Sequence, residues 1–195
     1  MSDYRYLQVK LAQAPGRQSQ AAFVEDLRGR GATAIRASGG EPLGLFTSQL
    51  GWPANEMAVL VRGDGEPGAL AAVERLDVVP LTPTIRPRPS DTLTAGGVYV
   101  HRWFHVLAQA RDEFVALSGQ GWGDFEGRFE AKVFGLLTAD EAPGEIVRFL
   151  LITRYGDHGE WERSRDPSTA AMQTFTRRQQ LTVWTTAAST LLTAL

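Results

Sequence analysis

The chain repeats itself at a fixed separation. The pentapeptide "LGLFT", which starts at Leu43, returns as "FGLLT" at Phe134, with the Gly and the Thr in the same places and an offset of 91 residues. The same offset carries the dipeptide "FV" from Phe23 to Phe114, so one shift aligns a predicted helix as well as a predicted strand. Agreement over two kinds of element indicates a duplicated unit. We therefore expect two similar halves.

Alternation and turn residues predict the elements of the first half. Leu7, Val9 and Leu11 share one side of an extended segment, which is the period of a strand. Glycines at 29, 31, 39 and 40 predict the fraying and the end of the first helix, and Pro67 predicts the start of a second one. In chain order we expect a strand at 4–11, a helix from about 19, a hairpin of strands at 43–50 and 57–62, a helix at 67–75 and a strand at 78–86.

The second half predicts the same order. The glycine-rich stretch "GQGWGDFEG" at 119–127 follows a predicted helix, so it is interpreted as a flexible loop or lid instead of a phosphate-binding turn. The expected elements are a strand at 98–107, a helix at 111–117, strands at 132–138 and 146–155, a helix at about 160–178 and a last strand at about 181–186. Each half thus comprises strand, helix, strand, strand, helix, strand.

A half of this kind cannot stand alone. Helices on one face of a four-strand sheet leave the other face exposed, and two such sheets can cover each other. The predicted fold is α+β, with two ferredoxin-like βαββαβ repeats whose antiparallel sheets pack into one pseudo-twofold eight-strand barrel with helices outside. We place the first repeat at 1–88, the second at 93–195 and a linker at 87–95.

Two stretches resemble a known family. "GLFTSQLGWPANEMAVLVRGDG" (Gly44–Gly65) is similar to the strand, turn and apolar strand of the NIPSNAP family, within the dimeric α+β barrel superfamily. "FGLLT" through "ITRYGDHGEWERSRD" (Phe134–Asp166) resembles the same hairpin followed by its Trp/Arg helix. The resemblance implies a pseudo-twofold barrel within one chain, where relatives often need two chains.

Bulk composition excludes several classes of function. A formal net charge of -2 provides no general field to attract nucleic acid or an anionic membrane. The chain contains no Cys, which removes disulfides, thiolate nucleophiles and cysteine-bound metals. Met1–Lys10 does not follow the pattern of a signal peptide, and no apolar run is long enough to span a bilayer. We expect a cytoplasmic protein without nucleic-acid or membrane partners.

The alternation also predicts the residues inside the barrel. If Leu7 faces the helices, Tyr6 faces the partner sheet, and aligning Tyr6 with Tyr99 places the polar alternate residues of the second half there too. An eight-strand barrel is wide enough either to be filled by side chains or to hold one small ligand. The predicted ligand-binding residues are Tyr99, His101, Trp103, His105, Arg154 and Trp184.

The histidines are candidate metal or haem ligands. On a strand, His101 and His105 lie about 13 Å apart, so one ion cannot take both, and no metal is expected. In superfamily members that bind haem, a His of the second half is the iron ligand, so the resemblance makes His158 the haem candidate, with Asp157 and Glu160 as orienting carboxylates. The simpler interpretation is an exposed His at a helix start. We expect no cofactor, with haem as the alternative.

Three functions stay open. The first is a NIPSNAP-like protein that binds a small aromatic or anionic molecule in the barrel interior. The second is an oxidoreductase, either haem-dependent or similar to the cofactor-independent monooxygenases, which use Asn, Trp and His; here the only Asn, Asn55, lies in a predicted turn. The third is a protein-interaction module with a filled barrel. Catalysis and association into homo-oligomers are left undecided.

Overall fold

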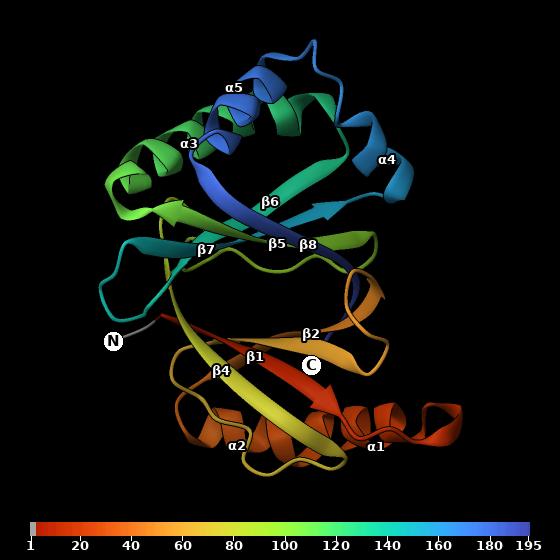
Figure 1. The fold of residues 1–195 in the computed structure, drawn as a ribbon. Helices are drawn as coiled ribbons and strands as arrows, with labels where there is room; N and C mark the ends of the chain where they lie inside the picture. The colour runs from red at the N-terminus through yellow and green to blue at the C-terminus, as the bar shows by residue number, and fades with distance from the viewer. Residues whose placement is uncertain (1–2) are drawn as a thin grey trace. The chain divides into compact units, whose positions relative to one another are not determined.

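The computed structural model describes residues 3–195 and has an α+β fold (Figure 1). Its eight strands follow the closed-barrel order β1-β3-β2-β8-β5-β7-β6-β4, which confirms the predicted fold class. The elements are β1 (Tyr4–Leu11), α1 (Gln18–Asp26), α2 (Ala32–Ala37), β2 (Glu41–Leu50), β3 (Glu56–Arg62), β4 (Val73–Pro83), β5 (Val98–Leu107), α3 (Arg111–Arg128), β6 (Ala131–Ala139), β7 (Ile146–Tyr155), α4 (His158–Arg163), α5 (Ala170–Gln179) and β8 (Thr182–Thr193).

The chain divides into two compact units. The first contains the residues up to Thr82 together with Thr190–Leu195, and the second contains Pro83–Ser189. The C-terminal end of β8 is thus grouped with the first unit. Among residues 3–195, no helix has both the length and the apolar character that crossing a membrane requires.

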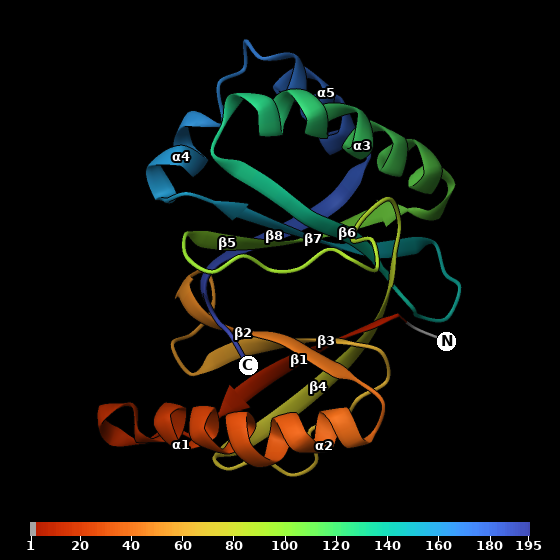
Figure 2. The same cartoon turned by 180° about the vertical axis from the view of Figure 1, so that it is seen from behind.

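In the first unit, α1 and α2 cover one face of a sheet in which β1 pairs with β3 and β4, and β3 pairs with β2 (Figure 2). The predicted sidedness of β1 is confirmed, because its alternate aliphatic residues belong to the same core cluster as helix residues such as Phe23 and Leu27. Its buried members are Leu7, Val9, Leu11, Phe23, Leu27, Ile35, Leu45, Met57, Val59 and Val61.

The first helical segment does not end at Gly29 or Gly31. A π-helical turn at Leu27–Gly31 joins α1 to α2, so the helical path continues to Ala37. A Cβ atom on Gly31 would lie 2.9 Å from Leu70 Cδ2, so the missing side chain lets a loop pack against the helix. Gly31 does not end the helix because it serves a tertiary contact, whereas the predicted end near Gly39 and Gly40 is confirmed, since α2 stops at Ala37 and Gly39 has φ +89°.

The predicted helix at 67–75 was also wrong. The segment is irregular until β4 starts at Val73. Gly68 has φ +68° and Ala72 has φ +60°, both in the left-handed region, which a right-handed helix cannot accommodate. The first unit therefore lacks the second helix of a complete βαββαβ repeat.

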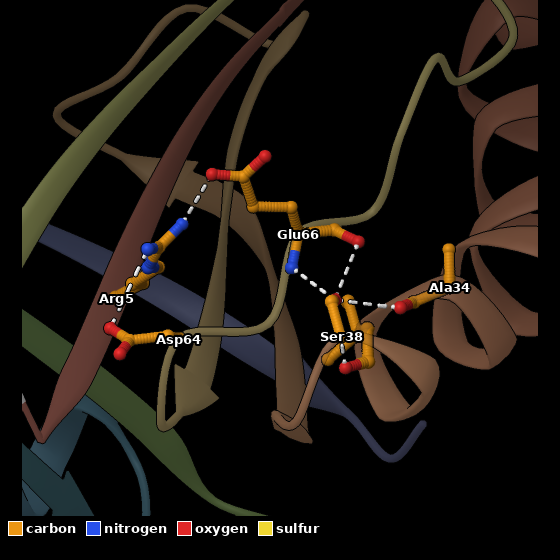
Figure 3. Close-up of polar contacts among 6 residues, drawn as sticks. Arg5, Ala34, Ser38, Asp64 and Glu66 are labelled. Atoms are coloured by element: carbon orange, nitrogen blue, oxygen red, sulfur yellow. Dashed lines mark hydrogen bonds and ion pairs between the residues drawn. The ribbon is translucent and has the colours of Figure 1, made fainter.

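Side chains from β1 and from the residue after α2 hold the residues that precede this irregular segment (Figure 3). Ser38 Oγ donates to the Ala34 carbonyl at 2.8 Å and accepts from the Glu66 amide at 2.9 Å. Arg5 Nη1 donates to Glu66 Oε1 at 2.6 Å, and Arg5 Nη2 lies 3.5 Å from Asp64 Oδ1. These contacts fix Asp64 and Glu66, which directly precede the irregular segment.

In the second unit, β7 pairs with β5 on one side and β6 on the other, and α3 and α5 lie over one face of this sheet (Figure 1). The strands β5 and β7 have the predicted bounds. A second core cluster fills the space between sheet and helices. Its buried members are Val100, Phe104, Val106, Phe114, Trp122, Phe125, Ala131, Val133, Leu136, Phe149, Leu151, Tyr155 and Ala171.

The glycine-rich stretch at 119–127 is helical, which corrects the prediction of a flexible loop. It forms the second half of α3. A Cβ on Gly121 would lie 2.8 Å from Phe175 Cζ, and one on Gly119 would lie 2.5 Å from Ile85 Cδ1. These glycines therefore allow α5 and the segment after β4 to approach α3 closely.

The predicted helix at about 160–178 is two helices. The Asp157 side chain caps α4 by accepting from the Glu160 amide at 2.6 Å. The Thr169 side chain caps α5 by accepting from the Met172 amide at 3.2 Å. Pro167 lies in the interruption between them, where its missing N–H is not needed for helix hydrogen bonds.

Both halves of the repeat carry the same irregularity. The register shifts between Pro42 and Gly44 where β2 pairs with β3, and between Val133 and Gly135 where β6 pairs with β7. The offset of 91 residues thus aligns two β-bulges. A bulge places an extra residue in one strand and often contains Gly, so the shared Gly of "LGLFT" and "FGLLT" has a structural cause.

The register also corrects one predicted equivalence. Tyr4 pairs with Arg62, and Tyr99 pairs with Arg154, so Tyr99 corresponds to Tyr4 instead of Tyr6. The counterpart of Tyr6 is His101. Because the correction is two residues, the predicted strand faces do not change.

Candidate ligand-binding site

The predicted site residues of β5 lie on the sheet face that is turned away from α3 and α5. The neighbouring residues Val100 and Phe104 belong to the helix-side core, so the alternate residues project from the opposite face. Tyr99 and His105 are six residues apart, which is about 20 Å along a strand. One small molecule cannot contact both ends of this row.

Tyr99 and Arg154 hold the linker at one end of the row. The Tyr99 hydroxyl donates to the Thr94 carbonyl at 2.7 Å and accepts from the Thr94 amide at 2.8 Å. Arg154 Nε donates to the Gly96 carbonyl at 2.9 Å. Burial raises the pKa of Tyr99, while the hydrogen bond to Thr94 and the charge of Arg154 oppose the shift. These polar groups are engaged in positioning the linker.

His101 lies in the middle of the row and is 1 % exposed. Burial lowers the pKa of its imidazole to about 3. Its counterpart in the first unit, Tyr6, is also buried, and burial raises the pKa of that phenol. Both side chains are therefore neutral at pH 7, and a base with a pKa near 3 is poorly matched to proton abstraction at that pH.

The other end of the row gathers aromatic and charged side chains, and we call it the Trp–His end. It consists of Trp103 and His105 of β5, Arg148 of β7, Trp184 of β8, and Glu141. The His105 and Trp184 rings lie 4.8 Å apart between centroids at an angle of 40°. The Arg148 guanidinium lies 5.0 Å from the Trp103 ring centroid, and its Nε donates to both Glu141 carboxylate oxygens at 2.9 and 3.0 Å. Trp184 is 59 % exposed, so its ring is accessible to a ligand.

The imidazole of His105 is the reactive group of this cluster. Burial lowers its pKa, as does the positive charge of Arg148, whereas Glu141 and a hydrogen bond to the Trp184 backbone oppose the shift. Among residues 3–195 the buried Nδ1 atom has no hydrogen-bond partner, so the backbone bond belongs to Nε2. A neutral ring that donates from Nε2 offers Nδ1 as an acceptor. The cluster therefore contains a buried acceptor that has no hydrogen-bond partner in the described residues, beside the exposed aromatic ring of Trp184.

Three of the six predicted ligand-binding residues, Trp103, His105 and Trp184, therefore come together, and Tyr99, His101 and Arg154 lie elsewhere along the row. Sequence reasoning missed Arg148 and Glu141. Arg148 could have been found, because it is six residues from Arg154 on β7 and even spacing places both on one face. Glu141 follows β6 in an irregular segment, where no periodicity predicts its direction.

His158 is exposed and is the first residue of α4. Its Nε2 lies 3.2 Å from Ser189 Oγ. The two predicted orienting carboxylates have other partners: Asp157 caps the helix, and Glu160 accepts from Arg163 Nε at 3.1 Å. An exposed ring of this kind does not fit the enclosed axial ligand of a haem, so we derive no step through haem. Within residues 3–195, no three His, Asp or Glu side chains form a group suited to a metal ion.

Comparisons with known proteins agree with the fold. The chain matches no protein-family model and no curated protein. Two solved structures, each named "putative monooxygenase", are similar in fold. The one from Lactobacillus acidophilus NCFM has a TM-score of 0.59 at 10 % identity over 97 % of this chain and 92 % of that one. The one from Fusobacterium nucleatum subsp. nucleatum has a TM-score of 0.54 at 9 % identity, with coverages of 97 % and 91 %.

A third solved structure, of an anthrone oxidase-like protein, has a TM-score of 0.57 at 12 % identity over 99 % of this chain and 94 % of that one. Identities this low show a common fold and leave the activity open. The chain thus has the α–β barrel fold of these three proteins.

Proposed function

We propose that this protein binds a small aromatic molecule carrying a hydroxyl group at the Trp–His end. The observation that carries the proposal is the buried Nδ1 of His105, which has no donor among residues 3–195, beside the exposed ring of Trp184. A buried acceptor without a donor costs free energy, and a ligand O–H would recover it. Trp184 supplies an aromatic surface for the rest of the ligand.

The charges favour a neutral or weakly acidic ligand. Arg148 attracts a phenol oxygen, but its charge is already shared with Glu141. A fully ionised ligand would have to compete with that carboxylate.

We also propose that the protein is related to the NIPSNAP family and that it is cytoplasmic. The similarity of Gly44–Gly65 and Phe134–Asp166 to that family supports the family relation.

Naphthalene derivatives test the proposal by separating stacking from hydrogen bonding. We expect 2-naphthol to bind more tightly than 2-methoxynaphthalene, because only the naphthol can donate to Nδ1. Trp184→Leu should weaken both by about tenfold through loss of the aromatic surface. His105→Phe keeps an aromatic ring but should reduce naphthol affinity to that of the methoxy compound. Isothermal titration calorimetry of each protein with each compound measures these affinities.

Val183→Ala is the matched control, because Val183 is 62 % exposed and adjoins Trp184 in sequence. It should leave both affinities unchanged. Equal affinity of the wild-type protein for the two naphthalenes would contradict the role of Nδ1. If neither compound binds, the protein-interaction alternative gains support.

A second candidate is cofactor-independent oxidation of a bound phenol or anthrone, favoured by the fold that the chain shares with the three solved structures. Asn55 is unsuited to a catalytic role, because its side-chain amide donates to the Leu11 carbonyl at 2.8 Å in the first unit. His105 would then be the base, through Nδ1. If the wild-type protein consumes oxygen with anthrone and His105→Phe does not, the oxidation proposal is supported. If the protein binds anthrone without consuming oxygen, only the binding proposal is supported.

A further inference from the structure

The second unit has a small, partly open cavity on the helix side of its sheet. Its volume is about 20 Å³. Three arginines from three different segments line it: Arg102 from β5, Arg165 from the connection between α4 and α5, and Arg178 from α5. The remaining lining residues are uncharged: Trp122, Phe125, Val133, Leu151, Thr153, Tyr155, Met172 and Phe175.

The guanidinium groups have few partners. Arg178 is 3 % exposed, and its only hydrogen bond within residues 3–195 is a long one of 3.4 Å from Nη1 to Ser118 Oγ. In the same described range, Arg178 Nε, Arg165 Nε and Arg165 Nη2 are buried without any acceptor. Three aromatic rings surround the Arg178 guanidinium at 4.6 to 5.6 Å, and they are those of Phe104, Phe114 and Phe175. The aromatic rings attract the positive charge of Arg178. They do not accept hydrogen bonds from the guanidinium N–H groups that point elsewhere in the guanidinium plane.

The neighbouring carboxylates are committed to other groups. Asp124 of α3 accepts from Arg128 at 2.5 Å and from the Ala171 amide at 3.0 Å. Asp166, next to Arg165, accepts from the Ser168 amide at 2.9 Å. Within the described part of the chain, none of the three cavity arginines forms an ion pair with a carboxylate.

Burial and the mutual repulsion of the three arginines lower the pKa values of two of them. Burial, together with repulsion from Arg102 and Arg165, lowers the pKa of Arg178 to about 9. Burial and repulsion from Arg165 lower the pKa of Arg102 to about 10. Both groups still carry a positive charge at pH 7, so the cavity concentrates positive charge in a desolvated space.

The first unit provides an internal comparison. Arg102 pairs with Leu151 and Leu7 pairs with Val59, which makes Leu7 the counterpart of Arg102 in the strand register. Leu7 belongs to the hydrophobic core cluster between the sheet and the helices of the first unit. Because the equivalent residue of the first unit is Leu7, the fold does not require an arginine at position 102. A role other than folding has to explain Arg102.

We propose that the cavity is a binding site for one small monatomic anion of the halide class, held by Arg102, Arg165 and Arg178. A cavity of about 20 Å³ has room for a single occupant of about the size of a water molecule. An anion there would accept from Nε of Arg165 and Nε of Arg178 and would neutralise part of the enclosed charge. It would join α5 and the α4–α5 connection to the sheet.

The test compares thermal unfolding in sodium chloride and in sodium gluconate at equal ionic strength, because gluconate is too large for the cavity. Chloride should raise the Tm of the wild-type protein by about 5 °C at saturating concentration. Arg178→Met and Arg102→Leu should lose this difference and should have a higher Tm than wild type in gluconate, since each removes an uncompensated charge. Arg177→Met, which removes an exposed neighbour on α5, should keep the chloride effect.

Crystals soaked in sodium bromide give an independent readout. We expect an anomalous peak within hydrogen-bonding distance of Arg165 Nε and Arg178 Nε. Identical Tm values in chloride and gluconate, together with no bromide peak, would overturn the proposal. A larger stabilisation by sulfate than by chloride, lost in the same variants, would show an oxyanion site and make the halide assignment wrong.

Discussion

Lowering the pH from 6.5 to about 3 should reduce the free energy of unfolding by about 4 kcal/mol through His101 alone. In the unfolded chain this imidazole takes up a proton near its ordinary pKa of 6.5, whereas burial delays protonation of the folded protein until about pH 3. The unfolded state therefore binds more protons throughout this window. The contribution is present above pH 6.5, is lost progressively as the pH falls below 6.5 and is gone once the pH has fallen through the folded pKa of about 3.

Urea unfolding of the wild-type protein and His101→Leu at pH 7, 6, 5 and 4 measures this contribution. The wild-type protein should lose stability relative to the variant at each step, by up to about 3 kcal/mol at pH 4. Carboxylates with lowered pKa values, such as Asp124 and Glu126, also titrate at acidic pH, but they cancel in the difference.

His158→Leu is the matched control, because His158 is exposed. Its stability should follow that of the wild-type protein at every pH. Parallel curves for wild type and His101→Leu would contradict the assignment and would mean that the folded protein admits a proton to His101.

Much of the fold could be predicted because its strands have one face toward a core. The alternation in β1 and β5 is a direct consequence of that geometry, so the bounds and the sidedness of both strands were correct. The repeat could also be predicted, because a bulge that contains Gly recurs at Gly44 and Gly135. Both features depend on local chemistry that a sequence displays directly.

The helices were predicted less well because their glycines have tertiary causes. Gly31 was predicted to lie where the first helix frays and Gly121 in a flexible loop, but each allows a distant side chain, Leu70 or Phe175, to approach a helix. A sequence does not show which residue packs there. The helix expected at 67–75 failed for a similar reason, since the Ala71 amide inside this segment donates to Asp26 Oδ2 of α1 at 2.7 Å.

The candidate site was recovered in part. The alternation of residues in β5 predicted that Trp103 and His105 lie on one face. It could not show that the Tyr99 hydroxyl is hydrogen-bonded to the backbone of Thr94 in the linker. Arg178 follows another arginine on an amphipathic helix, and nothing in that pair distinguishes the buried residue from the exposed Arg177. Only the packing of α5 on α3 and the sheet makes that distinction.

Gly135→Ala should destabilise the protein by about 3 kcal/mol. A Cβ at this position would lie 2.7 Å from Pro87 N and 2.8 Å from the Arg86 carbonyl oxygen, and both are backbone atoms. They cannot yield easily, because the Arg86 carbonyl accepts from the Leu136 amide at 3.1 Å and Arg86 Nη1 donates to Glu126 Oε1 at 2.6 Å. The substitution therefore forces the linker away from β6 or breaks these bonds.

Gly123→Ala is the control with the opposite sign. Gly123 lies inside α3, and in the described range 3–195 no atom beyond its own helix backbone and chain neighbours lies within 4 Å of the place that an alanine methyl group would take. Alanine should therefore stabilise the helix by about 0.5 to 1 kcal/mol. Urea unfolding measures both changes.

Hydrogen exchange locates the effect of Gly135→Ala. Displacement of the linker should speed exchange at the amides of Thr84 and Leu136, because Thr84 donates to the Leu136 carbonyl and Leu136 donates to the Arg86 carbonyl. Exchange at both amides should stay slow in Gly123→Ala, whose methyl group is far from these bonds in the chain. Unchanged exchange in Gly135→Ala, with full stability, would show that the linker accommodates the methyl group and that the shared Gly of the repeat serves only the bulge.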